Sequence, residues 1–441
     1  MRHLADQVMA KLSHLLVHVF FRSIELQCKE NLPNTGPVVL VANHNNGLID
    51  GLLLMAVLGR YPRFLGKSTL FKIVPLWPFL KFAGVIPVYR AIDGVPGDHN
   101  VSAFSTCHDI LARSGVVALF PEGISHDEPT LQPLKTGAAR IALDAGFENG
   151  VNPVVTVAVG LTYDSKTRFR SRALVRIAEP VSISRWSEEY QVDSQKAVRA
   201  FTDDVARQLA EVSPTYPSWA QAVKVSRIAE VVVRSPKGRF PSDVTMGDQV
   251  GTAERLAEIE MRDPGNARLQ ALDAAFAVYE RDLEFLGLSD SQIAAEYPRA
   301  RLRWLLVWSI VKVIFTIPFA AIGVIVHIVP FVIIKQIARR PANEGMKSTA
   351  KLLGCFASFV VVYTALGIIV GRREGAGAGL VIAMGSPLCG YAAVRLGERV
   401  RRVGGILGGY RIVANGTPVL RAVSDHRTAV VHAALGVLDT P

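Results

Sequence analysis

Three long apolar stretches near the C-terminus limit the folds open to this chain more than any other feature. Residues 304–334 form an apolar stretch that is interrupted by Lys312, Pro318, His327 and Pro330, and residues 352–370 and 376–394 are two further apolar runs. The first is longer than the roughly 20 residues that a helix needs to cross a bilayer, and the other two are close to that length. We therefore expect an integral membrane protein whose membrane segments lie within residues 304–395.

The first apolar stretch permits two arrangements. One straight span would put Lys312 inside the bilayer, which is costly, so we expect a Pro-broken hairpin around Pro318. The loop after it carries five basic residues and one acidic residue, which favours the cytoplasmic side. We expect runs 352–370 and 376–394 to form a two-span hairpin, although Arg372 and Arg373 in its turn argue mildly against this. The preceding domain should then face the cytoplasm.

The composition narrows the classes of partner. The chain has 441 residues, enough for two or three domains, and a formal net charge of +11. Such a basic balance suits anionic lipid or phosphorylated substrates, whereas zinc-finger spacings and aromatic-interleaved basic patches are missing, so nucleic acid is not expected. The four scattered cysteines have no metal-ligand spacing and indicate a reducing compartment.

The first half of the chain alternates short apolar runs with helical stretches. This pattern predicts an α/β fold, a mixed sheet covered by helices, followed by a helical segment and the C-terminal membrane helices. The expected strands are 38–42, 64–66, 85–89, 116–120, 154–161 and 173–177. The expected regions are an amphipathic membrane-associated helix (1–31), a sheet domain (32–181), a helical accessory domain (182–303), the membrane segments (304–395) and a cytoplasmic tail (396–441). The first helix packing on the sheet domain is an equally open alternative.

His44 and Asp50 lie just after the first of these strands. Both fall where a buried strand ends and a helix begins, the usual place for ligands in an α/β sheet. A carboxylate that holds one imidazole nitrogen leaves the other nitrogen as a general base. On this stretch alone, however, a polar turn with Asp50 capping the next helix is the simpler interpretation.

Further stretches add polar and cationic groups near other strand ends. The strand 85–89 is followed by Arg90, and Phe120-Pro-Glu-Gly places Glu122 and Gly123 in a tight turn after another strand. Each alone is a surface cation or a simple turn.

Three more cations suit a phosphate group. Lys135 precedes the start of a predicted helix, whose N-terminus attracts anions as the ammonium does. Arg170 and Arg172 share one face if their segment is extended, and two guanidiniums on one face make a phosphate clamp.

Together and in this order, these stretches resemble the four motifs of the membrane-bound glycerolipid acyltransferase superfamily. The motifs are the His–Asp pair, Gly-x-x-x-x-x-Arg ending at Arg90, Phe-Pro-Glu-Gly, and an apolar strand with proline, here 151–157. The blocks FPEGISHDEPTLQPLKTG and RFRSRALV look most like the glycerol-3-phosphate/dihydroxyacetone-phosphate branch. The resemblance covers roughly residues 20–395.

The resemblance implies an O-acyltransferase of phospholipid biosynthesis. It would move a fatty acyl group from an acyl thioester, acyl-CoA or acyl-carrier protein, to a hydroxyl of glycerol-3-phosphate, with no cofactor and no metal. His44, held by Asp50, would remove the proton from the hydroxyl, while Glu122 and Gly123 position the glycerol part. The residues implied to hold phosphate are Arg90, Lys135, Arg170 and Arg172.

Two departures from the family pattern bear on this interpretation. Five residues separate His44 from Asp50 where four are usual, which marks the branch and leaves open whether the two side chains bond. The arginine that often follows Phe-Pro-Glu-Gly is replaced by Ile124 and Ser125, which shifts phosphate binding to the later cations.

Two other functions remain open. Lysophosphatidate could be the acceptor, since it differs from glycerol-3-phosphate by one acyl chain. The chain could also be an inactive lipid-binding scaffold, against which the intact His–Asp pair argues.

Overall fold

The computed structural model describes residues 2–73, 76–89, 100–151, 153–166, 168–235, 244–293, 299–337, 344–415 and 418–439. The chain divides into two compact units, Met1–Thr215 with Gln336–Gly354, and Tyr216–Lys335 with Cys355–Pro441. Arg90, the cation expected at the end of the second motif, lies outside the described residues.

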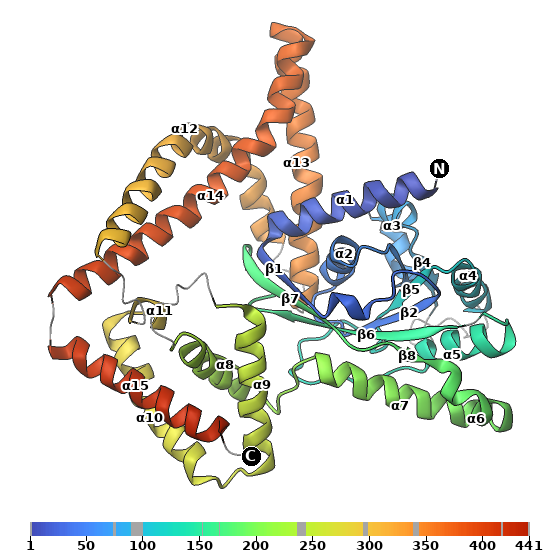
Figure 1. The fold of residues 1–441 in the computed structure, drawn as a ribbon. Coiled ribbons are helices and arrows are strands. Elements are labelled where there is room, and N and C mark those ends of the chain that lie inside the picture. The colour runs from blue at the N-terminus through green and yellow to red at the C-terminus, as the bar shows by residue number, and fades with distance from the viewer. Residues whose placement is uncertain are drawn as a thin grey trace. The chain divides into compact units, whose positions relative to one another are not determined.

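The described residues of the first unit form a sheet of eight strands in the order β1-β7-β6-β2-β5-β3-β4, with β8 paired to β6 (Figure 1). The strands are β1 (Phe21–Gln27), β2 (Val38–Ala42), β3 (Pro62–Lys67), β4 (Ile86–Val88), β5 (Val116–Leu119), β6 (Val155–Tyr163), β7 (Ser171–Ile177) and β8 (Val181–Ser182). β6 runs antiparallel to β7 and β8, and the other described pairs are parallel. This mixed sheet confirms the predicted α/β class.

Helices cover both faces of the sheet, which explains why β2 is apolar at every position. Successive side chains of β2 point to opposite faces, so Val39 and Val41 join the core under one set of helices. Val38 and Leu40 join the core on the other face. The first face is covered by α4 (Val101–Ala112), α5 (Gly137–Leu143) and α7 (Ser194–Val212), and the second by α1 (Arg2–Phe20), α2 (Leu48–Val57) and α3 (Trp77–Ala83). Shorter helices are η1 (Lys29–Asn31), η2 (Ser68–Lys72), η5 (Asp144–Glu148), η6 (Ile183–Trp186) and α6 (Ser187–Val192).

The N-terminal helix is part of the sheet domain. Met9 and Val17 are buried in the core shared with α2, while Leu4 and Leu15 are exposed. β1 follows α1 and pairs in parallel with β7, so the expected domain boundary at residue 31 is wrong. A strand was missed there because the preceding apolar helix runs into it without a break.

The boundary expected at residue 181 also differs from the structure. α7 contributes Ala197, Phe201 and Leu209 to the core under the sheet and therefore belongs to the first unit. The second unit contains α8 (Trp219–Val233), α9 (Met246–Arg262), α10 (Ala267–Leu286) and α11 (Asp290–Ile293), together with α15 (Pro418–Leu438). α15 packs into the core of this bundle, so residues 396–441 are not a simple tail.

Within the described residues, three helices are long and apolar enough to cross a membrane, over Leu306–Gln336, Gly354–Glu374 and Ala376–Arg401. They belong to α12 (Arg299–Ile337), α13 (Glu344–Glu374) and α14 (Ala376–Asn415). Helix α12 continues through Pro318, so the expected break there is wrong, but its ribbon is bent rather than straight (Figure 1). Proline removes one helical hydrogen bond and kinks a helix without having to end it.

Candidate active site

The loop after β2 brings His44 and Asp50 together. The Nδ1 atom of His44 lies 2.9 Å from Oδ2 of Asp50. Because the carboxylate accepts, Nδ1 carries the proton and Nε2 is left as an acceptor. The Asp50 side chain is fully buried, whereas the His44 side chain is 19% exposed. The pair therefore has the geometry of an oriented general base that solvent or substrate can reach.

The extra residue of this motif is accommodated by the loop backbone. Gly47 has a φ of 57°, a value that favours glycine, and it precedes α2. The backbone N–H of Asn46 donates to Oδ2 of Asp50 at 2.7 Å. Asp50 thus holds both the loop and the imidazole, and the longer spacing does not prevent the His–Asp bond.

Neighbouring strands fix the orientation of the His44 ring. The ring stacks on Phe120, with centroids 4.0 Å apart, and Phe120 in turn stacks on Phe64. The side chain of Asn43 extends the sheet beyond β2, donating to the Leu161 carbonyl at 3.0 Å and accepting from the Leu161 N–H at 2.7 Å. His44 is therefore held from both sides.

The other oxygen of Asp50 accepts a hydrogen bond from the hydroxyl of Tyr163 at 2.5 Å. Tyr163 is the last residue of β6, more than a hundred positions further along the chain. Sequence reasoning did not single it out. The available signal was the strand alternation, which places Tyr163 on the same face as Val159 and Leu161.

Glu122 lies beneath the His44 loop instead of facing open space. Its Oε1 accepts from the backbone N–H of His44 at 2.8 Å, and its Oε2 accepts from the Gln132 N–H at 2.9 Å and from His126. Burial alone would raise the pKa of Glu122, but the hydrogen bonds from His126, Gln132 and His44 lower it below its usual value. The described contacts give this carboxylate a role in holding the loop, and the predicted contact with glycerol stays a prediction.

The residues after Gly123 tie the third motif to the first. Ser125 accepts from the Gly47 N–H at 3.2 Å, and the His126 N–H donates to the His44 carbonyl at 3.3 Å. Gly123 itself has a φ of 73°, which the tight turn requires. Ser125, which with Ile124 replaces the family's arginine, and the neighbouring His126 therefore supply contacts within the site. His126 was not singled out from the sequence.

The predicted phosphate cations have different surroundings. Lys135 is exposed, and its N–H donates to the Pro121 carbonyl at 2.7 Å, which places it beside the turn of Gly123. Arg172 forms a two-pronged pair with Asp164, at 3.0 and 3.2 Å. The Arg168 guanidinium lies 3.9 Å from the same carboxylate.

Arg170 does not share a face with Arg172. It has a φ of 63° and precedes β7, so the extended conformation assumed for the clamp is wrong. Its guanidinium is buried and donates to the carbonyls of His18 and Phe21, both at 2.8 Å. This arginine fastens the end of α1 to the sheet.

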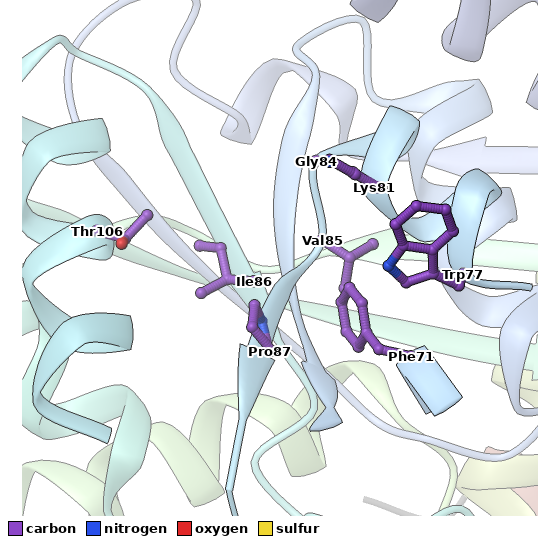
Figure 2. Close-up of a pocket in the computed structure, with 8 residues that line it drawn as sticks. All are labelled: Phe71, Trp77, Lys81, Gly84, Val85, Ile86, Pro87 and Thr106. Atoms are coloured by element: carbon purple, nitrogen blue, oxygen red, sulfur yellow. The ribbon is translucent and has the colours of Figure 1, made fainter. Parts of the chain in front are cut away.

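An apolar pocket of about 370 Å³ lies beside the edge strand β4 (Figure 2). Phe71, Trp77, Val85, Ile86 and Pro87 form most of its lining. The described lining comes from η2, α3, the turn between α3 and β4, β4 and α4, and does not include the His44 loop.

Comparisons with known proteins agree with the resemblance seen in the motifs. Residues 23–160 match the family model described as Acyltransferase. Over 262 residues the chain is 29% identical to glycerol-3-phosphate O-acyltransferase 2 of Saccharomyces cerevisiae, covering 58% of this chain and 34% of that protein. Over 141 residues it is 29% identical to a 1-acyl-sn-glycerol-3-phosphate acyltransferase of Chlamydomonas reinhardtii, covering 32% of this chain and 40% of that protein.

Among solved structures, the 1-acyl-sn-glycerophosphate acyltransferase of Thermotoga maritima matches with a TM-score of 0.35 and 20% identity, covering 48% of this chain and 80% of that one. The match to the yeast relative spans about a third of that protein's length. His44, Asp50 and Glu122 all lie inside the matched family region. Residues 23–160 therefore match the Acyltransferase family model, in agreement with the resemblance to the glycerolipid acyltransferases that the motifs show.

Proposed function

We propose that this protein transfers a fatty acyl group from an acyl thioester, acyl-CoA or acyl-carrier protein, to a hydroxyl of glycerol-3-phosphate. The observation that carries the proposal is the contact between His44 Nδ1 and Asp50 Oδ2 at the end of a buried parallel strand. The similarity to a yeast glycerol-3-phosphate O-acyltransferase supports the acceptor.

In the proposed reaction, Nε2 of His44 removes the proton from the acceptor hydroxyl as its oxygen attacks the thioester carbon. The C–S bond then breaks, and the imidazolium returns the proton to the departing thiolate. Such general base catalysis contributes about 10²- to 10⁴-fold. Asp50 stabilises the imidazolium and keeps Nε2 facing the acceptor.

Lys135 and Arg172 are the described cations that we assign to the acceptor phosphate. Lys135 is exposed beside the Gly123 turn. A phosphate would compete with Asp164 for the guanidinium of Arg172, since both anions suit its two-pronged geometry. We assign the three apolar helices to the membrane, from which lipid product and acyl donor can exchange, with the acyltransferase domain on the cytoplasmic face.

Lysophosphatidate is the second candidate acceptor, because the Chlamydomonas relative is named for that reaction. The two acceptors carry the same phosphate and differ by one acyl chain. The same assay therefore distinguishes them.

The test uses the purified full chain in detergent, with radiolabelled palmitoyl-CoA and either glycerol-3-phosphate or lysophosphatidate. We expect product from glycerol-3-phosphate, and a loss of roughly 10²- to 10⁴-fold in kcat in His44→Ala. His426→Ala is the matched control, because His426 also bonds an aspartate, Asp282, at 2.6 Å but lies in the helical unit. Turnover of lysophosphatidate alone would reassign the acceptor, and unchanged turnover in His44→Ala would overturn the mechanism. No turnover with either acceptor would favour the scaffold.

A further inference from the structure

Tyr163 reaches the His–Asp pair because β6 is longer than its neighbour β2. The two strands pair in parallel as far as Ala42 and Val159, where β2 ends. β6 continues for four more residues to Tyr163, and its two-residue alternation places that side chain on the face covered by α2. Asp50 lies in the first turn of α2.

The contact completes the hydrogen bonding of the Asp50 carboxylate. Oδ2 accepts from His44 and from the Asn46 N–H, and Oδ1 accepts from the Tyr163 hydroxyl. The Tyr163 ring stacks on Phe21 with centroids 5.6 Å apart, so the phenol is held by packing as well. With both oxygens fixed, the carboxylate cannot turn away from His44 without losing a second bond.

We propose that Tyr163 is a positioning residue of the acyl transfer, acting on His44 through Asp50. The inference rests on the proposed function and deepens it. The phenol stays a donor at neutral pH, because burial, and then the Asp50 charge, raise the pKa of Tyr163 well above its usual value. Tyr163 lies outside the matched family region, which ends at residue 160.

The test is Tyr163→Phe in the whole 441-residue chain, which removes the hydroxyl and keeps the stacked ring. We expect kcat to fall by roughly 10- to 100-fold, the fold-change of one hydrogen bond to a charged group, with little change in KM. The acid limb of the kcat/KM profile should move to higher pH, because Asp50 loses a donor and more of its negative charge falls on the imidazolium. The substitution leaves in place the other titratable residues that contact the His44 loop and its supports, so these do not account for the shift: Glu122, His126, Asp127 and Lys166.

Tyr190→Phe is the matched control. Its hydroxyl donates to Asp144 and Glu148, both at 2.8 Å, so the same atom is removed from another tyrosine–carboxylate contact of this unit. We expect Tyr190→Phe to leave kcat and the acid limb unchanged. Melting temperatures of both variants report any folding defect, and 3-fluorotyrosine at position 163, which keeps the hydroxyl, should retain wild-type kcat.

A double-variant cycle tests whether the effect passes through Asp50. Adding Tyr163→Phe to Asp50→Asn should lower kcat by less than about twofold, because the carboxylate that Tyr163 positions is already absent. The proposal is overturned if Tyr163→Phe matches Tyr190→Phe in kcat and pH profile. It is also overturned if Tyr163→Phe lowers kcat by the same factor in the Asp50→Asn background as in the wild type. Failure of the proposed function is a separate result, since it requires that the wild type be inactive or that His44→Ala retain activity.

Discussion

At the scale of single residues, Glu122 is a buried carboxylate whose two oxygens both accept hydrogen bonds. Its side chain has no exposed area and accepts from the backbone N–H groups of His44 and Gln132 and from His126. Removing one member of a buried ion pair leaves the other charge buried without a partner. This lowers the stability of the fold by more than the intact pair contributes to it. The loop that carries His44 therefore depends on Glu122 for its position, whether or not Glu122 touches a substrate.

We predict that Glu122→Gln destabilises the protein by about 3 kcal/mol near neutral pH. The lowered pKa of Glu122 fixes the pH dependence, because such a carboxyl stabilises the fold above its unfolded-state value of 4.5. This stabilisation is lost as the pH falls through the folded pKa, so the difference in melting temperature from wild type should shrink in acid. Melting curves between pH 7 and pH 3.5 measure it. The exposed Glu128→Gln is the control, and a difference that stays constant with pH would contradict the prediction.

The sequence predicts some site residues and not others for a physical reason. His44 and Asp50 are separated by a single loop, so the strand-to-helix pattern alone brings them close. Tyr163 meets Asp50 only because β6 overhangs β2, a register that no local pattern specifies. Arg170 was assigned to the wrong place because its left-handed backbone breaks the two-residue period.

At the scale of elements, the structure shows what the predicted alternation of strands and helices leaves out. Within the predicted strands 38–42 and 116–120, the residues of β2 and β5 are buried on both faces, so these runs are recognisable as strands. β1 lies at the edge of the sheet, with polar residues in FRSIELQ and no apolar run of its own. Its strand conformation comes from pairing with β7, which is a tertiary contact.

The junction of α1 and β1 gives a prediction that distinguishes a structural role of Arg170 from a phosphate-binding role of Arg172. Arg170→Ala should lower the stability of the sheet domain by about 2 kcal/mol, because it leaves the last carbonyls of α1 without their donor. Its KM for the phosphorylated acceptor should stay near wild type. Arg172→Ala should instead raise that KM, with a smaller loss of stability.

Melting temperatures and acceptor titrations of the two arginine variants measure both effects. The comparison is matched, since the two residues are two positions apart and undergo the same change. A selective rise in acceptor KM in Arg170→Ala would restore the phosphate role that the sequence pattern gave it.

At the scale of the whole molecule, the core of the second unit limits how the chain can cross a membrane. Leu272 of α10 and Val430 of α15 are buried in the same cluster, and Arg427 of α15 donates to Asp290 at 2.8 Å. Helices that share one core lie on the same side of a bilayer. The chain between α10 and α15 must therefore cross an even number of times, although three described helices are apolar and long enough.

An even number of crossings means that one of the three apolar helices does not cross, and the features of α12 make it that helix. It contains Pro318 and Pro330 and is bent in Figure 1, and its Thr316 hydroxyl accepts from Arg399 near the end of the apolar part of α14. From the sequence, the lysine and prolines in this stretch argue against one straight span. The packing of α15 on α10 could not be predicted, because it joins residues about 150 positions apart.

We predict that α13 and α14 form the membrane-crossing hairpin and that the turn between them lies opposite the rest of the described chain. Single cysteines at Glu258 in α9, Ser424 in α15 and Glu374 at the turn, in a background without the native cysteines, can be labelled in sealed vesicles with an impermeant maleimide. The exposed positions 258 and 424 should react from the same side, and position 374 only from the other. If positions 258 and 424 react from opposite sides, all three apolar helices cross, and the shared core of α10 and α15 does not form in the membrane.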